Sequence, residues 1–227
     1  MKFSSTAVIA TFLFGYVATS DAVLTKLASF DGASGTTWKW RDMNDPVMGG
    51  QSTSTFQVDS GNKVGVFNGT CAIVPKLNAP GFAKVSTTGW NSFPDVSSYS
   101  SGFMQLRVRS TTPQFFGFRI AFAAKDVPHT SIFGGGSFKS GFNLTDTTDF
   151  QIVKVPFNSF SYDWSPFTGR CDTKDPTGQQ HHCCSSVDNY KYCPKPKYLS
   201  AITDIELWAE GVEGDFHLEV DYIGADA

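Results

Sequence analysis

Short stretches in which apolar and polar residues alternate are the feature of this sequence that most restricts its fold. Successive side chains of a strand point to opposite faces, so each stretch is expected to bury the face that carries its apolar residues. This prediction places Phe116 and Tyr222, at the ends of two stretches, in the core. No segment holds a 3.6-residue apolar period over a dozen residues, so helix should be minor. The pattern predicts an all-β fold of two antiparallel sheets, either a sandwich or a jelly roll. The alternating stretches lie at 104–109, 116–122, 153–157, 205–209 and 216–222.

The first twenty residues have the three-part layout of a cleavable secretory signal. Lys2 precedes an apolar run over 7–17, and small residues follow at Ala18 and Ser20. A mitochondrial presequence is the alternative, but such segments are rich in Arg and the first Arg here is Arg41. We therefore expect export of a single domain over 21–227, without a membrane span. In that compartment the sequons at Asn68 and Asn143 are candidate glycosylation sites.

Composition and motifs favour binding over catalysis. A formal net charge of -3 gives no basic excess for nucleic acid. The sequence contains neither a Gly-x-Ser-x-Gly elbow nor a His-Glu-x-x-His helix motif, and the glycine run 134–136 lacks the residues of a phosphate-binding loop. We expect no enzyme activity and no cofactor.

Charged residues on the polar side of the expected strands form the first candidate ligand surface. The alternation places them opposite the core, and we expect them on neighbouring strands of one sheet. They either pair with one another in solvent or line a groove for a ligand or partner. A hydrolase using Glu219 and Asp221 is a weaker alternative. The surface comprises Arg107, Arg109, Arg119, His217, Glu219 and Asp221.

Residues 165–196 interrupt the strand pattern and are expected to form one long inserted loop rich in Cys and Pro. Four of the five cysteines lie in it, and disulfides are the expected state in an oxidising compartment. Cys183 and Cys184 are too close to bridge each other readily, so each needs a partner among Cys71, Cys171 and Cys193, and one cysteine is left over. A zinc site using His181 and His182 is the alternative, although the ligand spacing is unfavourable. No metal site is predicted.

The most distinctive stretch is 40–52, Trp-Arg-Asp-Met-Asn-Asp-Pro-Val-Met-Gly-Gly-Gln-Ser. With the strand 106–109, the segment 153–160 and the end 214–224, it resembles the complex I intermediate-associated protein 30 family over residues 28–225. The resemblance implies a galactose-binding-like jelly roll, similar to certain carbohydrate-binding modules, and a chaperone-like role in assembling respiratory complex I. The resemblance is compatible with a bound structural calcium ion and implies no enzyme activity.

Two kinds of partner follow from these observations, a protein and a glycan. Within the distinctive stretch, Asn44, Asp45 and Ser52 either close a tight turn or form a ligand-contacting loop. A glycan site would be favoured by Trp38, Trp90 or Trp164 standing on the surface, because sugars stack on exposed aromatic faces. If all three were buried, a glycan site would be disfavoured.

Overall fold

The computed structural model describes residues 23–45, 49–74, 79–89, 92–128, 136–184 and 187–227. The expected signal 1–20, Trp90 and most of the glycine run 134–136 lie outside the described residues. Within the described ranges, no helix is both long and apolar enough to cross a membrane.

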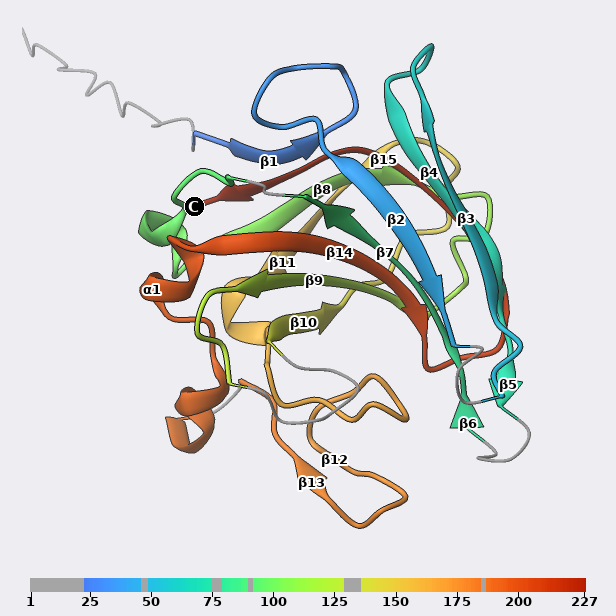
Figure 1. The fold of residues 1–227 in the computed structure, drawn as a ribbon, viewed down its shortest axis with the longest axis vertical. Coiled ribbons are helices and arrows are strands. Elements are labelled where there is room, and N and C mark those ends of the chain that lie inside the picture. Colours follow the sequence, from blue (N-terminus) through green and yellow to red (C-terminus); the bar gives the residue numbers. More distant parts are fainter. Residues whose placement is uncertain (1–22, 46–48, 75–78, 90–91, 129–135, 185–186) are drawn as a thin grey trace, which may run out of the picture.

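One antiparallel sheet has six strands, in the order β11-β8-β15-β4-β3, with β1 also paired to β15 (Figure 1). The long strand β15 pairs with β4 along its first half and with β1 near its end, while β8 runs along its other side. The strands are β1 (Thr25–Ser29), β3 (Thr53–Asp59), β4 (Val64–Cys71), β8 (Phe103–Arg109), β11 (Gln151–Pro156) and β15 (Gly214–Asp226).

The second sheet has five antiparallel strands in the order β10-β9-β14-β7-β2 and packs face to face with the first (Figure 1). All recorded pairings in both sheets are antiparallel, so the predicted two-sheet sandwich is confirmed. The strands are β2 (Lys39–Asn44), β7 (Phe82–Thr88), β9 (Phe118–Ala124), β10 (Ser137–Gly141) and β14 (Ile202–Glu210).

The remaining elements are short and lie outside the two sheets. The predicted insertion contains the hairpin of β12 (Thr173–Lys174) and β13 (Gln180–His181), which extends below the sandwich in Figure 1. Short 3₁₀ helices cover 97–99, 157–159 and 187–192, and the α-helix α1 (Pro196–Leu199) has four residues. The strands β5 (Ile73–Val74) and β6 (Ala79–Pro80) form a second small hairpin.

Phenylalanine rings fill most of the space between the sheets. Burying each ring stabilises the fold by roughly 1.5–3 kcal/mol, so this set supplies a large part of the hydrophobic stabilisation. Neighbouring rings pack in pairs, for example Phe122 and Phe138, whose centroids lie 5.2 Å apart. The fully buried rings belong to Phe67, Phe118, Phe122, Phe138, Phe157 and Phe160.

Two residues expected in the core do not face it. Phe116 is 59% exposed because β9 begins only at Phe118, which leaves Phe116 in the preceding connection. Tyr222 pairs with Arg107 on the polar side of the sheet, because the register of β15 shifts between Val220 and Tyr222. The bulge reverses the alternation, so Ile223 takes the core position instead.

Candidate functional site

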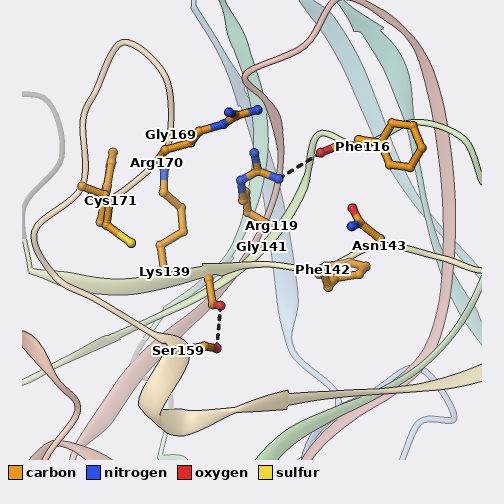
Figure 2. Close-up of a pocket in the computed structure, with 12 residues that line it drawn as sticks. Phe116, Arg119, Lys139, Gly141, Phe142, Asn143, Ser159, Gly169, Arg170 and Cys171 are labelled. Carbon is orange, nitrogen blue, oxygen red and sulfur yellow. Dashed lines mark hydrogen bonds between the residues drawn. The ribbon is translucent and has the colours of Figure 1, made fainter. Parts of the chain in front are cut away.

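A polar pocket of about 500 Å³ lies beside the edge strand β10, on the outer face of the five-stranded sheet (Figure 2). Five segments build it: the connection that holds Phe116, the start of β9 with Arg119, strand β10 with the residues after it, the helical turn 157–159, and the segment from Trp164 into the inserted loop. Three cationic side chains line the pocket, and among its described lining residues there is no carboxylate. The lining residues are Phe116, Arg119, Lys139, Ser140, Gly141, Phe142, Asn143, Ser159, Trp164, Gly169, Arg170 and Cys171.

Lys139 forms the floor of this polar pocket. Its ammonium group pairs with Glu210 and lies 3.3 Å from the ring centroid of Trp164 and 4.2 Å from that of Trp208. Burial lowers the pKa of Lys139 to about 8, although the charge of Glu210 acts in the opposite direction. The two rings and the carboxylate therefore compensate a charge that would otherwise be costly to bury.

Arg119 and Arg170 supply the other two positive charges. Arg119 is only 7% exposed, and its Nη1 donates to the carbonyl oxygens of Phe116 at 3.2 Å and Phe118 at 2.9 Å. Burial lowers the pKa of Arg119, Glu210 opposes that shift, and the charge of Arg170 adds to it. Figure 2 shows both guanidinium groups on the same side of the pocket. In the described part of the chain neither arginine belongs to an ion pair.

An aromatic contact holds the inserted loop against the sheet, and two disulfides link parts of the loop to one another. Trp164 packs on Trp208 with centroids 5.7 Å apart, over Ala121 on the outer face of the sheet. Cys171 bridges Cys183, and Cys184 bridges Cys193. The first bridge directly follows Arg170, so it restrains the segment that forms one wall of the pocket.

A buried histidine ties the same loop together internally. His181 is fully buried, with Nδ1 2.9 Å from Asp163 and Nε2 3.3 Å from Asp175. Hydrogen bonds, led by that from the Thr177 hydroxyl, lower the pKa of Asp175 to about 2. This arrangement commits His181 to two carboxylates, so it carries out a structural task in a loop that has little apolar core.

The cysteine prediction is confirmed in its main point, because Cys183 and Cys184 have different partners. Cys71 is the cysteine left over, and burial raises its pKa to about 12. The zinc alternative required thiolates beside His181 and His182, but the four loop cysteines are disulfide-bonded. Among the described residues, no group of three His, Cys, Asp or Glu side chains is placed to hold a metal ion.

The polar sheet face predicted from the alternation exists on the six-stranded sheet, but its charges pair with one another. Arg107 Nη1 lies 2.5 Å from Asp221 Oδ2, and Arg109 Nη2 lies 2.7 Å from Glu219 Oε2. Both guanidinium groups also cover the ring of Phe150, at 4.4 and 4.7 Å from its centroid. These mutual contacts correspond to the ion-paired interpretation of this face.

His217 belongs to this face as well. Its Nδ1 accepts a hydrogen bond from the backbone N–H of Thr111 at 3.1 Å, and Nε2 lies 3.5 Å from Glu219. Burial lowers the pKa of His217, with Glu219 opposing and Arg109 adding to the shift. The ring therefore has protein partners on both sides.

The placement of Arg119 on the same sheet was wrong. Arg119 is the second residue of β9 in the five-stranded sheet, whereas Arg107 and Arg109 lie on β8 in the six-stranded sheet. Alternation along a strand gives the face of each residue but not the sheet that the strand joins, because strand pairing is non-local. Arg119 lines the polar pocket instead.

The segment around Asn44, Asp45 and Ser52 is a structural junction. The buried Asp45 carboxylate accepts hydrogen bonds from Ser52 N at 3.1 Å, Ser52 Oγ at 3.0 Å and Phe82 N at 2.9 Å. Ser52 Oγ in turn accepts from Ala72 N at 3.1 Å, and Asn44 Oδ1 accepts from Ser54 Oγ at 2.7 Å. The contacts tie four segments together. The chain between Asp45 and Gly49, where a tight turn was predicted, lies outside the described residues.

The described tryptophans do not offer an exposed platform. Trp38 is half-buried, packs on Phe93 at 4.9 Å between centroids, and donates from Nε1 to the Leu27 carbonyl. Trp164 is 4% exposed. Trp90 lies outside the described residues. Among the described aromatic residues, Phe116 at the pocket and Tyr190 in the inserted loop have exposed side chains.

The two sequons occupy different settings. Asn68 lies within β4, between Thr55 of β3 and His217 of β15, and is half-buried rather than in an exposed loop. Asn143 is exposed in the segment that follows β10 and lines the polar pocket.

Sequence reasoning missed most of the pocket. No sequence pattern marked Lys139 as a strand or site residue. Strand β10 reads Ser-Phe-Lys-Ser-Gly and, with a single large apolar residue, shows no alternation. Arg170 was hidden inside the expected loop. A usable signal was the neighbourhood of Trp164, since a Trp at the start of a polar insertion needs a surface to cover.

The fold and the pocket define an all-β, two-sheet sandwich with a cationic pocket beside an insertion. The chain belongs to the complex I intermediate-associated protein 30 (CIA30) family, whose model matches residues 28–174. A search of the curated proteins returned no match.

Solved structures of carbohydrate-active proteins resemble this chain at low sequence identity. The agarase AgWH50C aligns with a TM-score of 0.50 and 13% identity, over 90% of this chain and 24% of that one. A family 11 carbohydrate-binding module of the cellulase Lic26A-Cel5E of Clostridium thermocellum gives 0.49 and 16%, over 92% and 97%. The Clostridium thermocellum family 11 module in complex with a mixed-linked tetrasaccharide gives 0.48 and 17%, over 89% and 94%. At these identities the likeness concerns the fold alone.

Proposed function

We propose that the chain is a non-catalytic module that binds an oligosaccharide, with one sugar unit held in the polar pocket. The observation that carries the proposal is the pocket itself. Its volume of about 500 Å³ falls within the roughly 300–1,000 Å³ typical of small-ligand sites.

The mixture of groups in the pocket suits a sugar. The ring of Phe116 offers an apolar surface to the C–H face of a pyranose, while the amide of Asn143, when its sequon carries no glycan, offers hydrogen bonds to the hydroxyl groups of the sugar. Guanidinium groups add donors in a fixed geometry.

We expect neither of the candidate carboxylates, Glu219 and Asp221, to hydrolyse a bound sugar. Glu219 and Asp221 each contact an arginine on the sheet opposite to the pocket, so neither faces the proposed ligand. We expect no release of reducing sugar from any oligosaccharide that the protein binds.

An oligosaccharide array probed with the full chain, followed by calorimetry on the best binder, tests the proposal. Phe116→Ala should weaken binding at least tenfold, because it removes the exposed ring. Ile152→Ala is the matched control, since Ile152 is also exposed but lies on the edge strand of the other sheet. Failure of every oligosaccharide to bind would refute the proposal.

A protein partner is the second candidate, and the family description favours it because it names association with an intermediate of complex I. The exposed side chain of Ile152, on edge strand β11, would be its contact. Chemical cross-linking of the native protein to an abundant partner, abolished by Ile152→Asp but not by Phe116→Ala, would support this candidate over the first.

We further propose that the protein is secreted rather than mitochondrial. Two disulfides in the inserted loop support this location, because such bonds persist in oxidising compartments. Mass spectrometry of the mature N-terminus should find a start near residue 21. Import into isolated mitochondria would contradict it.

A further inference from the structure

We infer that the polar pocket selects an acidic saccharide unit, one carrying a carboxylate or a sulfate group, over a neutral one. The inference rests on the proposed function and adds the charge of the ligand to it. Its basis is the distribution of ion pairs over the two sheets.

Every half-buried lysine or arginine on the strands outside the pocket has a carboxylate partner, whereas the exposed Lys26, Lys39, Arg41 and Lys174 belong to no ion pair among the described residues. The pairs Arg107–Asp221, Arg109–Glu219 and Lys84–Glu206 join neighbouring strands, and Lys154–Asp226 reaches across β8 from β11 to β15. Arg119 departs from this rule, because it is nearly buried and has no such partner among the described residues, and the nearby carboxylate of Glu210 is bound to Lys139. The exposed Arg170 beside it also belongs to no ion pair in the described chain. Two positive charges therefore face the pocket uncompensated, in a chain whose formal net charge is -3.

The positive charges of Arg119 and Arg170 repel each other, and a bound anion would offset that repulsion. Arg119 is nearly buried, and burial and the neighbouring charge of Arg170 both disfavour its charged form. Arginine stays protonated in proteins, so the repulsion persists in the empty pocket. An anion between the two guanidinium groups would relieve it and gain charge-assisted hydrogen bonds.

Arg119 is also fixed in position before any ligand arrives. Its Nη1 is held by two backbone carbonyls, and that restraint reduces the side-chain entropy lost on binding. Arg170 is exposed but is adjacent to the Cys171–Cys183 disulfide, which restrains its backbone. A planar carboxylate and a tetrahedral sulfate both present oxygens that such donors bind, so the shared feature is an anionic oxygen cluster on a sugar.

Calorimetry with the full chain and three tetrasaccharides of equal length tests the inference: an oligogalacturonate, a sulfated galactan fragment and a neutral galactan fragment. We expect at least one acidic probe to bind at least tenfold more tightly than the neutral one, with affinity that falls as salt is raised. The two acidic probes separate carboxylate from sulfate as the source of the charge.

Arg170→Ala is the primary variant because an exposed side chain can be removed without unfolding the protein, and Arg119→Gln is the second. Either should reduce the preference for the acidic probe at least fivefold, because binding of the acidic probe weakens more than binding of the neutral one. Arg41→Ala is the control, since Arg41 is an exposed arginine on β2, at the opposite edge of the same sheet. It should bind all probes as the wild type does.

The outcomes separate the inference from the proposed function. Equal affinity for neutral and acidic probes would overturn the inference and leave the saccharide function standing. An acidic preference that Arg41→Ala reduces as much as Arg170→Ala would also overturn it, because the effect would then come from general surface charge. If no tetrasaccharide binds and the array is also negative, the proposed function fails as well.

Discussion

Replacing Asp45 by Asn tests whether the junction at the start of the distinctive 40–52 stretch is structural. The exchange keeps the size of the side chain and changes one oxygen to an amino group. In the native protein Oδ1 accepts from Ser52 N, while Oδ2 accepts from Ser52 Oγ and Phe82 N. Either orientation of the amide therefore places its amino group against a backbone N–H.

The magnitude follows from those contacts. The variant loses a buried hydrogen bond to a charged acceptor, about 1.5–3 kcal/mol, and leaves a buried N–H donor without a partner, about 1–3 kcal/mol. We expect the free energy of unfolding to fall by about 3–5 kcal/mol, a large share of the roughly 5–15 kcal/mol of a typical domain. Relaxation is limited, because Gly50 and Gly81 are packed so closely that a Cβ on either would collide with the carboxylate.

Urea denaturation followed by tryptophan fluorescence measures the change, and the midpoint should fall by roughly 1–2 M at unchanged slope. Asp42→Asn is the control, since Asp42 is exposed on β2, the strand that ends just before Asp45, and the exchange should change stability by less than about 0.5 kcal/mol. A loss below about 1 kcal/mol for Asp45→Asn, accompanied by weaker ligand binding, would refute the structural assignment and favour the ligand-contacting loop instead.

Three further predictions concern the charged face and the cysteines. Arg107→Ala should lower the free energy of unfolding by no more than about 1 kcal/mol in chemical denaturation and leave saccharide binding unchanged, because its pair with Asp221 is solvent-exposed. Mild reduction of both disulfides should make the 165–196 loop sensitive to protease while the circular dichroism of the sandwich persists; global unfolding would show that the loop is integral to the core. Burial keeps the Cys71 thiol protonated up to about pH 12, whereas the unfolded chain loses that proton near pH 9, so stability should fall with rising pH between these values. Denaturation of Cys71→Ala across that range should show a smaller fall than the wild type, and equal slopes would contradict the assignment.

The parts of the fold that the sequence predicted are those encoded locally. Alternation over 104–109 and 205–209 identified β8 and β14, because a strand with one buried face needs apolar residues at every second position. The pairing of Cys183 and Cys184 with different partners followed from the geometry of adjacent residues. Neither inference required knowledge of distant parts of the chain.

The errors arose where distant segments decide the outcome. The bulge before Tyr222 is invisible in a strand whose residues otherwise alternate, and it exchanges the faces of all later residues. Which sheet contains Arg119 depends on the pairing of β9 with β14, about eighty residues further along the chain. The ion pairs of Arg107 and Arg109 likewise depend on β8 lying beside β15.

The polar pocket shows why function was harder to predict than fold in this chain. A sandwich needs only buried faces, whereas the pocket exists because an insertion covers an outer sheet face that would otherwise be solvated. Trp164 anchors the insertion on Trp208, the same two rings shield the ammonium group of Lys139, and Lys139 occupies Glu210. Once Glu210 is occupied, Arg119 has no carboxylate partner in the described chain and remains available to a ligand. The buried ion pair thus engages Glu210, the carboxylate near Arg119, with Lys139. The aromatic contact that fixes the loop therefore also influences the charge of the pocket.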